Sequence, residues 1–208
     1  MSSSLTAAPS DVQGSDARFN TIPSLDGALP LVTVRHLTKT YRGRPALRDL
    51  SLSLPAGRIV GLMGANGCGK TTLLKILAGV LADYEGQVRI AGHAPGPLSK
   101  ALVSFLPDAD FLATSLTPPR AIAQFSRLFA DFDAAKARRL VDFFALPAER
   151  SIKEMSKGMG EKLRIALMMS RRARVYLLDE PISGVDPAAR EIILDGVLRD
   201  FDSDSLML

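Results

Sequence analysis

The sequence has a single cysteine and no long apolar run, and each absence excludes a class of protein. Its 208 residues include only Cys68, so no disulfide can form within the chain, in agreement with a reducing compartment. The strongest apolar runs, residues 59–63 and 73–77, are far shorter than the ~20 residues that a membrane-spanning helix requires. No basic residue precedes Arg18 and no apolar signal core is present, so we expect a cytoplasmic protein without a secretory signal peptide.

The sequence also has no long block of like charge. The formal net charge is +4 and the isoelectric point is about 9.4, which suits phosphate ligands, an anionic membrane face or nucleic acid. Because lysine and arginine are scattered along the chain, nucleic acid is disfavoured and phosphate is the better candidate. Hydrophobic residues make up 47% of the chain, enough for a buried core, so a wholly disordered protein is excluded.

The chain divides into a polar N-terminal segment and a folded remainder. Residues 1–30 are rich in Ser, Ala, Asp, Gly and Pro without an apolar period, so we expect a disordered tail. Residues from about 117 to 173 have helical apolar spacing, and a further helix is expected at 187–199 with Asp186 as its N-cap. Short apolar or β-branched runs predict strands at 31–36, 50–54, 58–63, 87–90, 175–178 and from 205. This order predicts an α/β protein with a helical block inserted between strands.

Residues 64–71 carry a phosphate-binding pattern of Gly, four residues, Gly, Lys and Thr. The pattern follows a predicted strand and opens a predicted helix at 70–78, as a P-loop requires, which disfavours an ordinary glycine-rich turn with a solvated lysine. In such a loop backbone N–H groups surround the phosphates, Lys70 neutralises phosphate oxygens and the Thr71 hydroxyl reaches Mg²⁺. The predicted nucleotide ligands are Gly64, Asn66, Gly67, Cys68, Gly69, Lys70, Thr71 and Thr72.

Two carboxylates follow the buried strand expected at 175–178. The carboxyl ends of such strands are where α/β proteins bind ligands. We therefore expect Asp179 to hold Mg²⁺ and Glu180 to orient and polarise the water that attacks the γ-phosphate. Seen alone, the pair could be two solvated acids at a strand end, but the P-loop upstream disfavours that interpretation.

Residues 155–160, about twenty positions before the acidic strand end, resemble the signature motif of ABC ATPases, usually written LSGGQ. Ser156 and Gly158 are kept, whereas Lys157 and Met159 depart from the consensus. Alone, the segment could be a plain helix N-cap. The resemblance covers about residues 31–208. It implies a P-loop NTPase core sheet with an antiparallel β subdomain and an inserted α-helical subdomain, and ATP and Mg²⁺ as ligands.

Two further positions follow the order of the family's motifs. Tyr41 precedes the P-loop where the family places an aromatic ring that stacks on adenine, although a lone tyrosine is often only a half-buried strand residue. After the acidic strand end, residues 183–186 resemble the family's D-loop, which crosses the dimer interface and here ends in Asp186.

Two positions depart from the family pattern. Asp108 stands where the family usually has the glutamine of its Q-loop; a carboxylate there could still bind Mg²⁺ or its water, with more charge and a shorter reach. The family's switch histidine follows the strand that begins near Leu206, and neither His36 nor His93 can replace it. The resemblance therefore implies that the sequence stops before that histidine.

The resemblance implies a function in transport. In the family, two such domains bind head to tail, and the P-loop of one and the signature of the other enclose each ATP. We expect a homodimer, or a heterodimer with a similar ATPase chain, that drives a separate transmembrane permease from the inner face of the cell membrane. The alternatives are a soluble ABC ATPase acting on ribosomes or nucleic acid, and a nucleotide-binding module that no longer turns over.

Overall fold

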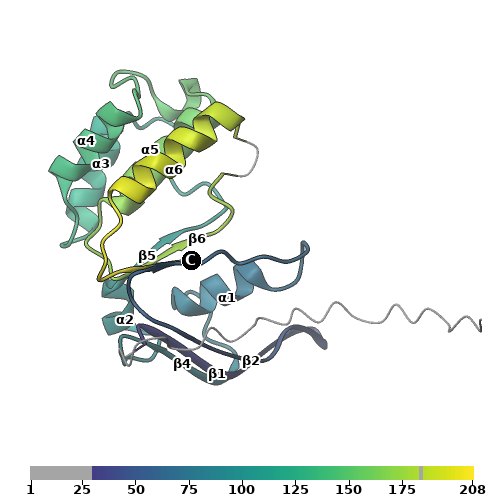
Figure 1. Ribbon diagram of the computed structural model, residues 1–208. Coiled ribbons are helices and arrows are strands. Elements are labelled where there is room, and N and C mark those ends of the chain that lie inside the picture. The colour runs from purple at the N-terminus through teal and green to yellow at the C-terminus, as the bar shows by residue number, and fades with distance from the viewer. Residues whose placement is uncertain (1–29, 183–184) are drawn as a thin grey trace, which may run out of the picture.

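The structure is a computed structural model that describes residues 30–182 and 185–208. The expected disordered tail, apart from Pro30, and the D-loop residues Ser183 and Gly184 lie outside the described residues. The described elements form layers (Figure 1). A group of helices covers one side of a parallel sheet, and helix α1 with an antiparallel sheet covers the other side.

The antiparallel sheet has the strand order β2-β1-β4, with β1 at Val32–Tyr41, β2 at Arg44–Leu54 and β4 at Glu85–Ile90. Apolar residues alternate along β1, and Val32 and Val34 face the core. Strands β1 and β2 are longer than predicted because they meet in a tight hairpin. Arg42 and Gly43 both have positive φ, 47° and 79°, as a two-residue hairpin turn requires.

The parallel sheet has the strand order β3-β7-β6-β5, with β3 at Arg58–Ile59, β7 at Leu206–Met207, β6 at Val175–Leu178 and β5 at Val103–Leu106. Strand β3 is shorter than the predicted run 58–63, because the chain leaves the ladder after the Val60 N–H donates to Met207. Alternate residues of β6 face opposite sides of the sheet. Val175 and Leu177 belong to the core under the antiparallel sheet, and Tyr176 belongs to the core under the helices.

Helix α1 (Lys70–Leu77) follows the P-loop and buries four apolar side chains between the two sheets, those of Leu73, Leu74, Ile76 and Leu77. Gly79 follows its C-cap with φ of 68°, and its N–H donates to the Ile76 carbonyl, so the predicted glycine stop is confirmed. The short helix α2 (Pro97–Ala101) leads into β5.

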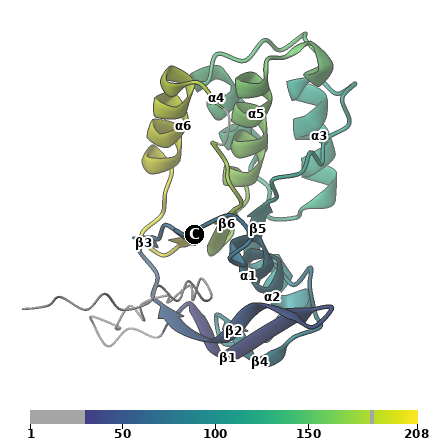
Figure 2. The same ribbon diagram turned by 90° about the vertical axis from the view of Figure 1, so that its right-hand side faces the viewer.

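The remaining helices stand together on the far side of the parallel sheet (Figure 2). They are α3 (Pro118–Leu128), α4 (Ala134–Phe143), the short 3-10 helix η1 (Ile152–Glu154), α5 (Lys157–Met169) and α6 (Pro187–Arg199). The Asp186 carboxylate accepts a hydrogen bond from the Ala189 N–H, which confirms the predicted N-cap of α6. Phe125, Leu140 and Leu163 join α3, α4 and α5 in one apolar core.

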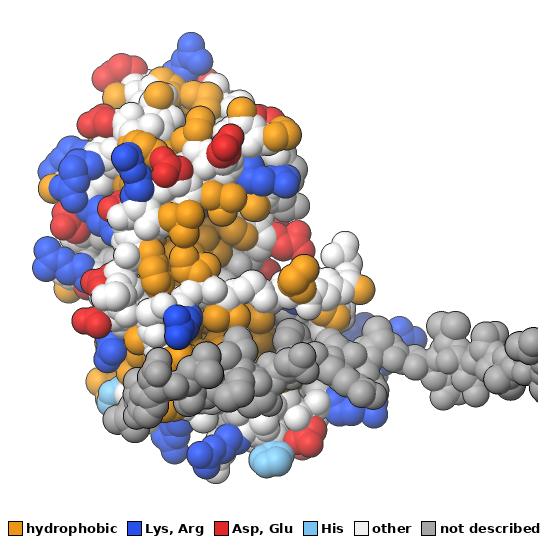
Figure 3. Space-filling view, viewed as in Figure 1, with side chains coloured by type: hydrophobic (Ala, Val, Ile, Leu, Met, Phe, Trp, Pro, Cys, Tyr) orange, Lys and Arg blue, Asp and Glu red, His pale blue; other side chains and the backbone are white. Residues whose placement is uncertain are grey.

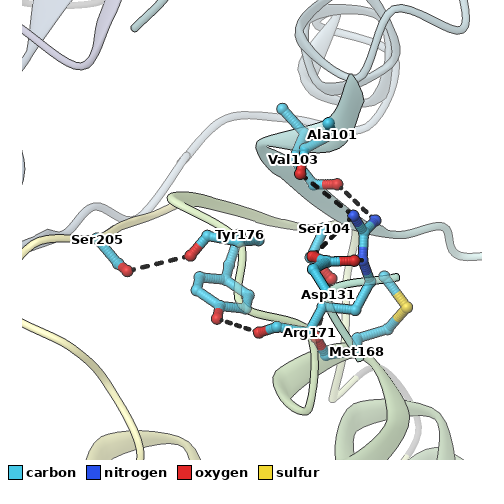
Figure 4. A network of polar contacts seen from close by, with 9 residues as sticks. Ala101, Val103, Ser104, Asp131, Met168, Arg171, Tyr176 and Ser205 are labelled. Atoms are coloured by element: carbon cyan, nitrogen blue, oxygen red, sulfur yellow. Dashed lines mark hydrogen bonds and ion pairs between the residues drawn. The ribbon is translucent and has the colours of Figure 1, made fainter. Parts of the chain in front are cut away.

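A buried arginine ties this helical group to the sheet (Figure 4). The Arg171 guanidinium binds the Asp131 carboxylate between α3 and α4 through Nε at 3.1 Å and through a terminal nitrogen at 3.0 Å. The same guanidinium donates to the carbonyls of Val103 at 2.9 Å and Ala101 at 3.4 Å, and it lies 4.3 Å from the centre of the Phe129 ring. Arg171 therefore links the turn between α3 and α4 to the start of β5.

An apolar groove of about 460 Å³ lies between α6 and the parallel sheet (Figure 3). Leu194 and Leu198 of α6 line one side, and Ile59 and Leu208 line the other. Within residues 30–182 and 185–208, no helix is both long and apolar enough to cross a membrane.

Candidate nucleotide site

The P-loop approaches β2 so closely that its glycine at position 69 cannot be replaced. A Cβ on Gly69 would lie 2.3 Å from the Ala46 carbonyl oxygen and 2.8 Å from the Leu47 side chain. Gly69 also has φ of 99° and Gly67 has φ of 83°, conformations that other residues rarely adopt. The glycines thus turn the backbone sharply before the first residue of α1.

Lys70 lies folded across this loop. Its ammonium donates to the carbonyl of Gly64 at 2.8 Å and to that of Ala65 at 3.2 Å. Cys68 is half-buried in the same loop, and a Cβ on Gly64 would meet its sulfur at 2.6 Å. The loop is therefore compact, with the one charged side chain at its mouth.

Thr71 and Asp179 meet where α1 begins and β6 ends. The Thr71 hydroxyl donates to Oδ1 of Asp179 at 2.9 Å, and Asp179 is 3% exposed. The other carboxylate oxygen, Oδ2, is buried and has no hydrogen-bond partner among the described residues. A buried oxygen without a partner costs about 1–3 kcal/mol, so this atom indicates a missing ligand.

These two residues fit Mg²⁺. The ion prefers oxygen ligands and in nucleotide sites uses one or two protein side chains plus phosphates and water. A hydroxyl and an unpartnered carboxylate oxygen supply that ligand set. Among the described residues, no group of three or more His, Cys, Asp or Glu side chains gathers into a metal site.

Glu180 follows Asp179 in a left-handed conformation with φ of 51°, which is uncommon outside glycine. Glu180 lines a cavity of about 290 Å³ at the P-loop and also borders the apolar groove beside α6. The residues that line this P-loop cavity are Tyr41, Ala46, Asn66, Gly67, Gly69, Lys70, Thr71, Thr72 and Glu180. The structure thus brings the aromatic position, the P-loop and the acidic strand end together around one space.

Ala46 is the lining residue that the sequence did not indicate. It belongs to β2, and its contact with the P-loop depends on the packing of the antiparallel sheet rather than on any local motif. Tyr41 is 45% exposed at the end of β1, so its ring is accessible from the cavity.

Ser156 and Gly158, the residues that resemble the signature motif, lie at the start of α5 and not at the P-loop cavity. The Ser156 hydroxyl accepts a hydrogen bond from the Met159 N–H at 3.2 Å as the N-cap of α5. Gly158 packs against the start of α6, where an added Cβ would lie 3.6 Å from Ala189 and 3.8 Å from the Asp186 carboxylate. Neither Ser156, Gly158 nor Asp186 is among the described residues that line the P-loop cavity.

Asp108 also lies outside the cavity. It is exposed, and its carbonyl accepts a 3.5 Å hydrogen bond from Arg164 of α5. Arg164 also pairs with Asp110 at 3.1 Å and with the buried Glu161. Burial raises the pKa of the Glu161 carboxyl, while the hydrogen bond and the charge of Arg164 lower it. The part of Asp108 in metal binding stays a prediction.

Comparison with known proteins places these features in one family. Residues 47–183 match the family described as ABC transporter. The chain is 28% identical over 166 residues to the ABC transporter ATP-binding protein YtrB of Bacillus subtilis, covering 79% of this chain and 57% of YtrB. It is 35% identical to the aliphatic sulfonates import ATP-binding protein SsuB 1 of Xanthomonas axonopodis, covering 77% of this chain and 66% of that protein.

The chain therefore spans between about half and two thirds of the length of these two relatives. Its fold is similar to that of a solved structure described as a putative ABC transporter ATP-binding protein from Pyrococcus furiosus, with a TM-score of 0.73 and 21% identity. That alignment covers 85% of this chain and 89% of the other, so the layers of Figure 1 are those of an ABC-type ATP-binding domain.

Proposed function

This chain belongs to the ABC transporter family, and from that premise we propose that it binds MgATP, hydrolyses it and powers a separate membrane permease. The observation that carries the proposal is the contact of Thr71 with Asp179, because the unpartnered Oδ2 of Asp179 lies at the same point. A hydroxyl and a buried carboxylate at the mouth of a P-loop are the groups that Mg²⁺ and a nucleotide triphosphate require.

Two charged side chains of the cavity, Lys70 and Glu180, have direct parts in the proposed reaction. Lys70 releases the carbonyls of Gly64 and Ala65 and binds phosphate oxygens, whose negative charge is the stronger partner for an ammonium. Glu180 accepts a hydrogen bond from the attacking water and orients it toward the γ-phosphorus, and water replaces ADP as the group on that phosphorus. Bound Mg²⁺ supplies positive charge that stabilises the transferring phosphoryl group.

The signature residues act on a second copy. Ser156 and Gly158 lie on the helical group, apart from the P-loop cavity of their own chain. In a head-to-tail pair, the N-terminus of α5 of one protomer faces the γ-phosphate bound by the other, and the free N–H groups there favour an anion. The pair is two copies of this chain or this chain with a similar ATPase.

The proposed role in transport rests on the functions named for two related proteins. SsuB 1 is described as an import ATP-binding protein and YtrB as a transporter ATP-binding protein. We therefore place this chain at the inner face of the cell membrane, held there by its permease. ATP closes the two protomers around two nucleotides, hydrolysis opens them, and the motion is passed to the permease.

The Glu180→Gln variant tests the catalytic part of this proposal. Glutamine keeps the size of the side chain and removes its charge, so MgATP binding should persist while turnover falls by roughly a hundredfold or more. Binding is measured by calorimetry and turnover by phosphate release, with Glu191→Gln on the exposed face of α6 as the matched control. Turnover of Glu180→Gln equal to that of the control would remove Glu180 from the chemistry.

A further inference from the structure

We infer that Lys39 is a positioning residue that holds the Tyr41 ring in place for the nucleotide base. The inference rests on the proposed function, since it requires that a nucleotide occupy the P-loop cavity. It adds a residue of β1 that does not itself line that cavity.

The geometry of β1 places Lys39 directly beside Tyr41. The pairing of β1 with β2 shifts register between Leu37 and Lys39 and again after Lys39, so simple alternation does not fix the faces there. The contact itself places them side by side, because the Lys39 ammonium lies 4.9 Å from the centre of the Tyr41 ring. Leu37 is fully buried in the core and Tyr41 is half-exposed at the cavity, with Lys39 between them. The lysine thus stands at the border between the core and the cavity.

Lys39 is buried to a degree that is rare for a lysine. The residue is 5% exposed, although a lysine is almost never fully buried unless it is paired. Its ammonium donates a 2.7 Å hydrogen bond to the Asp83 carboxylate, whose side chain is 96% exposed. The ammonium is also 4.9 Å from the centre of the Tyr41 ring and lies over it. A charge held this way can fix the orientation of the ring it touches.

The ion pair also joins β1 to the segment between α1 and β4. Tyr41 ends β1, whereas Asp83 lies between α1 and β4, in the segment that follows the P-loop helix. Lys70, Thr71 and Thr72 begin that helix and line the phosphate end of the cavity. The contact between Lys39 and Asp83 therefore ties the Lys39 ammonium, and with it the Tyr41 ring, to the segment that follows α1.

The ring offers a base only one free face. Lys39 covers one face of Tyr41, so an adenine must stack on the other, and the cation keeps the ring from turning edge-on. Without the cation the ring would sample more orientations, and ordering it would weaken binding of the base. Binding of the phosphates should not change, because the Lys39 ammonium binds Asp83 and Lys39 is not among the described residues that line the P-loop cavity.

The test compares ATP with tripolyphosphate, a probe that carries phosphates and no base. Affinities are measured by calorimetry with Mg²⁺ on the full chain in the Glu180→Gln background, so that ATP is not consumed. Lys39→Met keeps the length of the side chain without the charge. It should weaken ATP binding by roughly threefold to tenfold, the scale of one cation–π contact, and leave tripolyphosphate binding unchanged.

A double-mutant cycle tests whether the effect of Lys39 on ATP binding depends on the Tyr41 ring. Tyr41→Ala should itself weaken ATP binding by roughly tenfold, and adding Lys39→Met to it should cause no further loss. Asp83→Asn is the second variant in case Lys39→Met does not fold. It removes the charge of the partner of Lys39 but keeps an oxygen that can accept the Lys39 hydrogen bond, so it should shift ATP binding in the same direction by a smaller factor.

Three results would overturn the inference. The first is that Lys39→Met weakens the affinities for ATP and for tripolyphosphate equally. The second is that Lys39→Met weakens ATP binding as much in the Tyr41→Ala chain as in the parent. The third is that neither Lys39→Met nor Asp83→Asn weakens ATP binding. Failure of the proposed function gives a different result, since the parent chain would then bind neither ATP nor tripolyphosphate. If the parent chain bound ATP and tripolyphosphate equally well, the base would contribute nothing to binding. That result would refute the stacking role of Tyr41 while leaving the proposed binding of phosphates intact.

Discussion

The Thr71 hydroxyl donates a 2.9 Å hydrogen bond to the Asp179 carboxylate across a separation of 108 residues in the chain. Thr71 lies in the first turn of α1 and Asp179 follows β6, so the contact exists only when the parallel sheet and the P-loop helix are both in place. It brings two oxygen ligands to the position where the phosphates of a nucleotide would enter.

The first prediction concerns this hydroxyl. Thr71→Val has the shape of threonine without the oxygen, and it should weaken MgATP binding by roughly tenfold to a hundredfold, as expected for a lost contact to a charged group. Thr71→Ser keeps the oxygen and should bind within about threefold of the parent. Nucleotide titrations with Mg²⁺ and with EDTA check the reason, because the loss in Thr71→Val should shrink when Mg²⁺ is removed. A loss of the same size in EDTA would place the hydroxyl on the nucleotide rather than on the metal.

The second prediction concerns the buried ion pair of Figure 4. Arg171→Met leaves the Asp131 carboxylate and two carbonyls without their donor, so the free energy of unfolding should fall by about 3 kcal/mol. The control is Arg172→Met, because the neighbouring arginine is 78% exposed and its pair with Asp133 at 3.6 Å should contribute nothing measurable. Urea denaturation distinguishes the two variants. Equal stability of both would mean that the helical group is held to the sheet by apolar packing alone.

The motifs of the site were predictable from sequence because each one is local. The P-loop pattern, the two acids and the N-cap of α6 are set by neighbouring residues. In the structure the P-loop precedes α1, the acids follow β6 and Asp186 caps α6, while the roles of the P-loop and the acids stay predictions. Strand lengths were less accurate, since the pairing of Tyr41 with Arg44 extends β1 beyond the apolar run that revealed it.

Contacts between distant segments could not be predicted in this way. Ala46 lines the cavity because β2 packs on the P-loop, and Lys39 meets Asp83 because β1 passes the end of α1. Arg164 of α5 likewise binds the Asp108 carbonyl across 56 residues of chain, while the part of the exposed Asp108 side chain in metal binding stays a prediction. These contacts join residues that are far apart in the chain, so no local spacing in the sequence predicts them. They depend on how the two sheets and the helices pack.

The third prediction concerns pH. Burial raises the pKa of Glu161 in the folded state, so the folded chain keeps a proton at pH values where the unfolded chain has lost it. The stabilising contribution of this carboxyl is therefore complete below its ordinary value of 4.5 and is lost as pH rises through the folded value.

Denaturation of the parent chain and of Glu161→Gln between about pH 4.5 and pH 7.5 measures this effect. The stability of the parent relative to Glu161→Gln should decline as pH rises. Arg164→Met should steepen the decline, because the guanidinium that lowers the Glu161 pKa is gone. A difference that grows in favour of the parent with rising pH would reverse the assigned sign.

The last prediction compares substitutions at Gly158 and Gly69, because the proposed function gives these two glycines different roles. An added Cβ at Gly158 would meet only ordinary contacts of 3.6 Å or more, so Gly158→Ala should fold and bind ATP as the parent does. At Gly69 the same atom would lie 2.3 Å from a carbonyl oxygen, and Gly69→Ala should lose nucleotide binding.

If the start of α5 lies against the nucleotide of the second protomer, Gly158→Ala should lower turnover by roughly tenfold or more without changing ATP affinity. The added methyl group faces Ala189 and Asp186 of its own chain, so it acts on how α5 and α6 meet at the two-copy site and not on the nucleotide directly. Complementation then tests the head-to-tail arrangement. Gly158→Ala and Lys70→Ala chains are each expected to be nearly inactive alone, but a mixed pair joins one intact P-loop to one intact signature. Phosphate release by the mixture should therefore exceed that of either variant. If mixing restores nothing while the two chains still associate, the signature does not serve the partner's nucleotide, and the two-copy site is wrong.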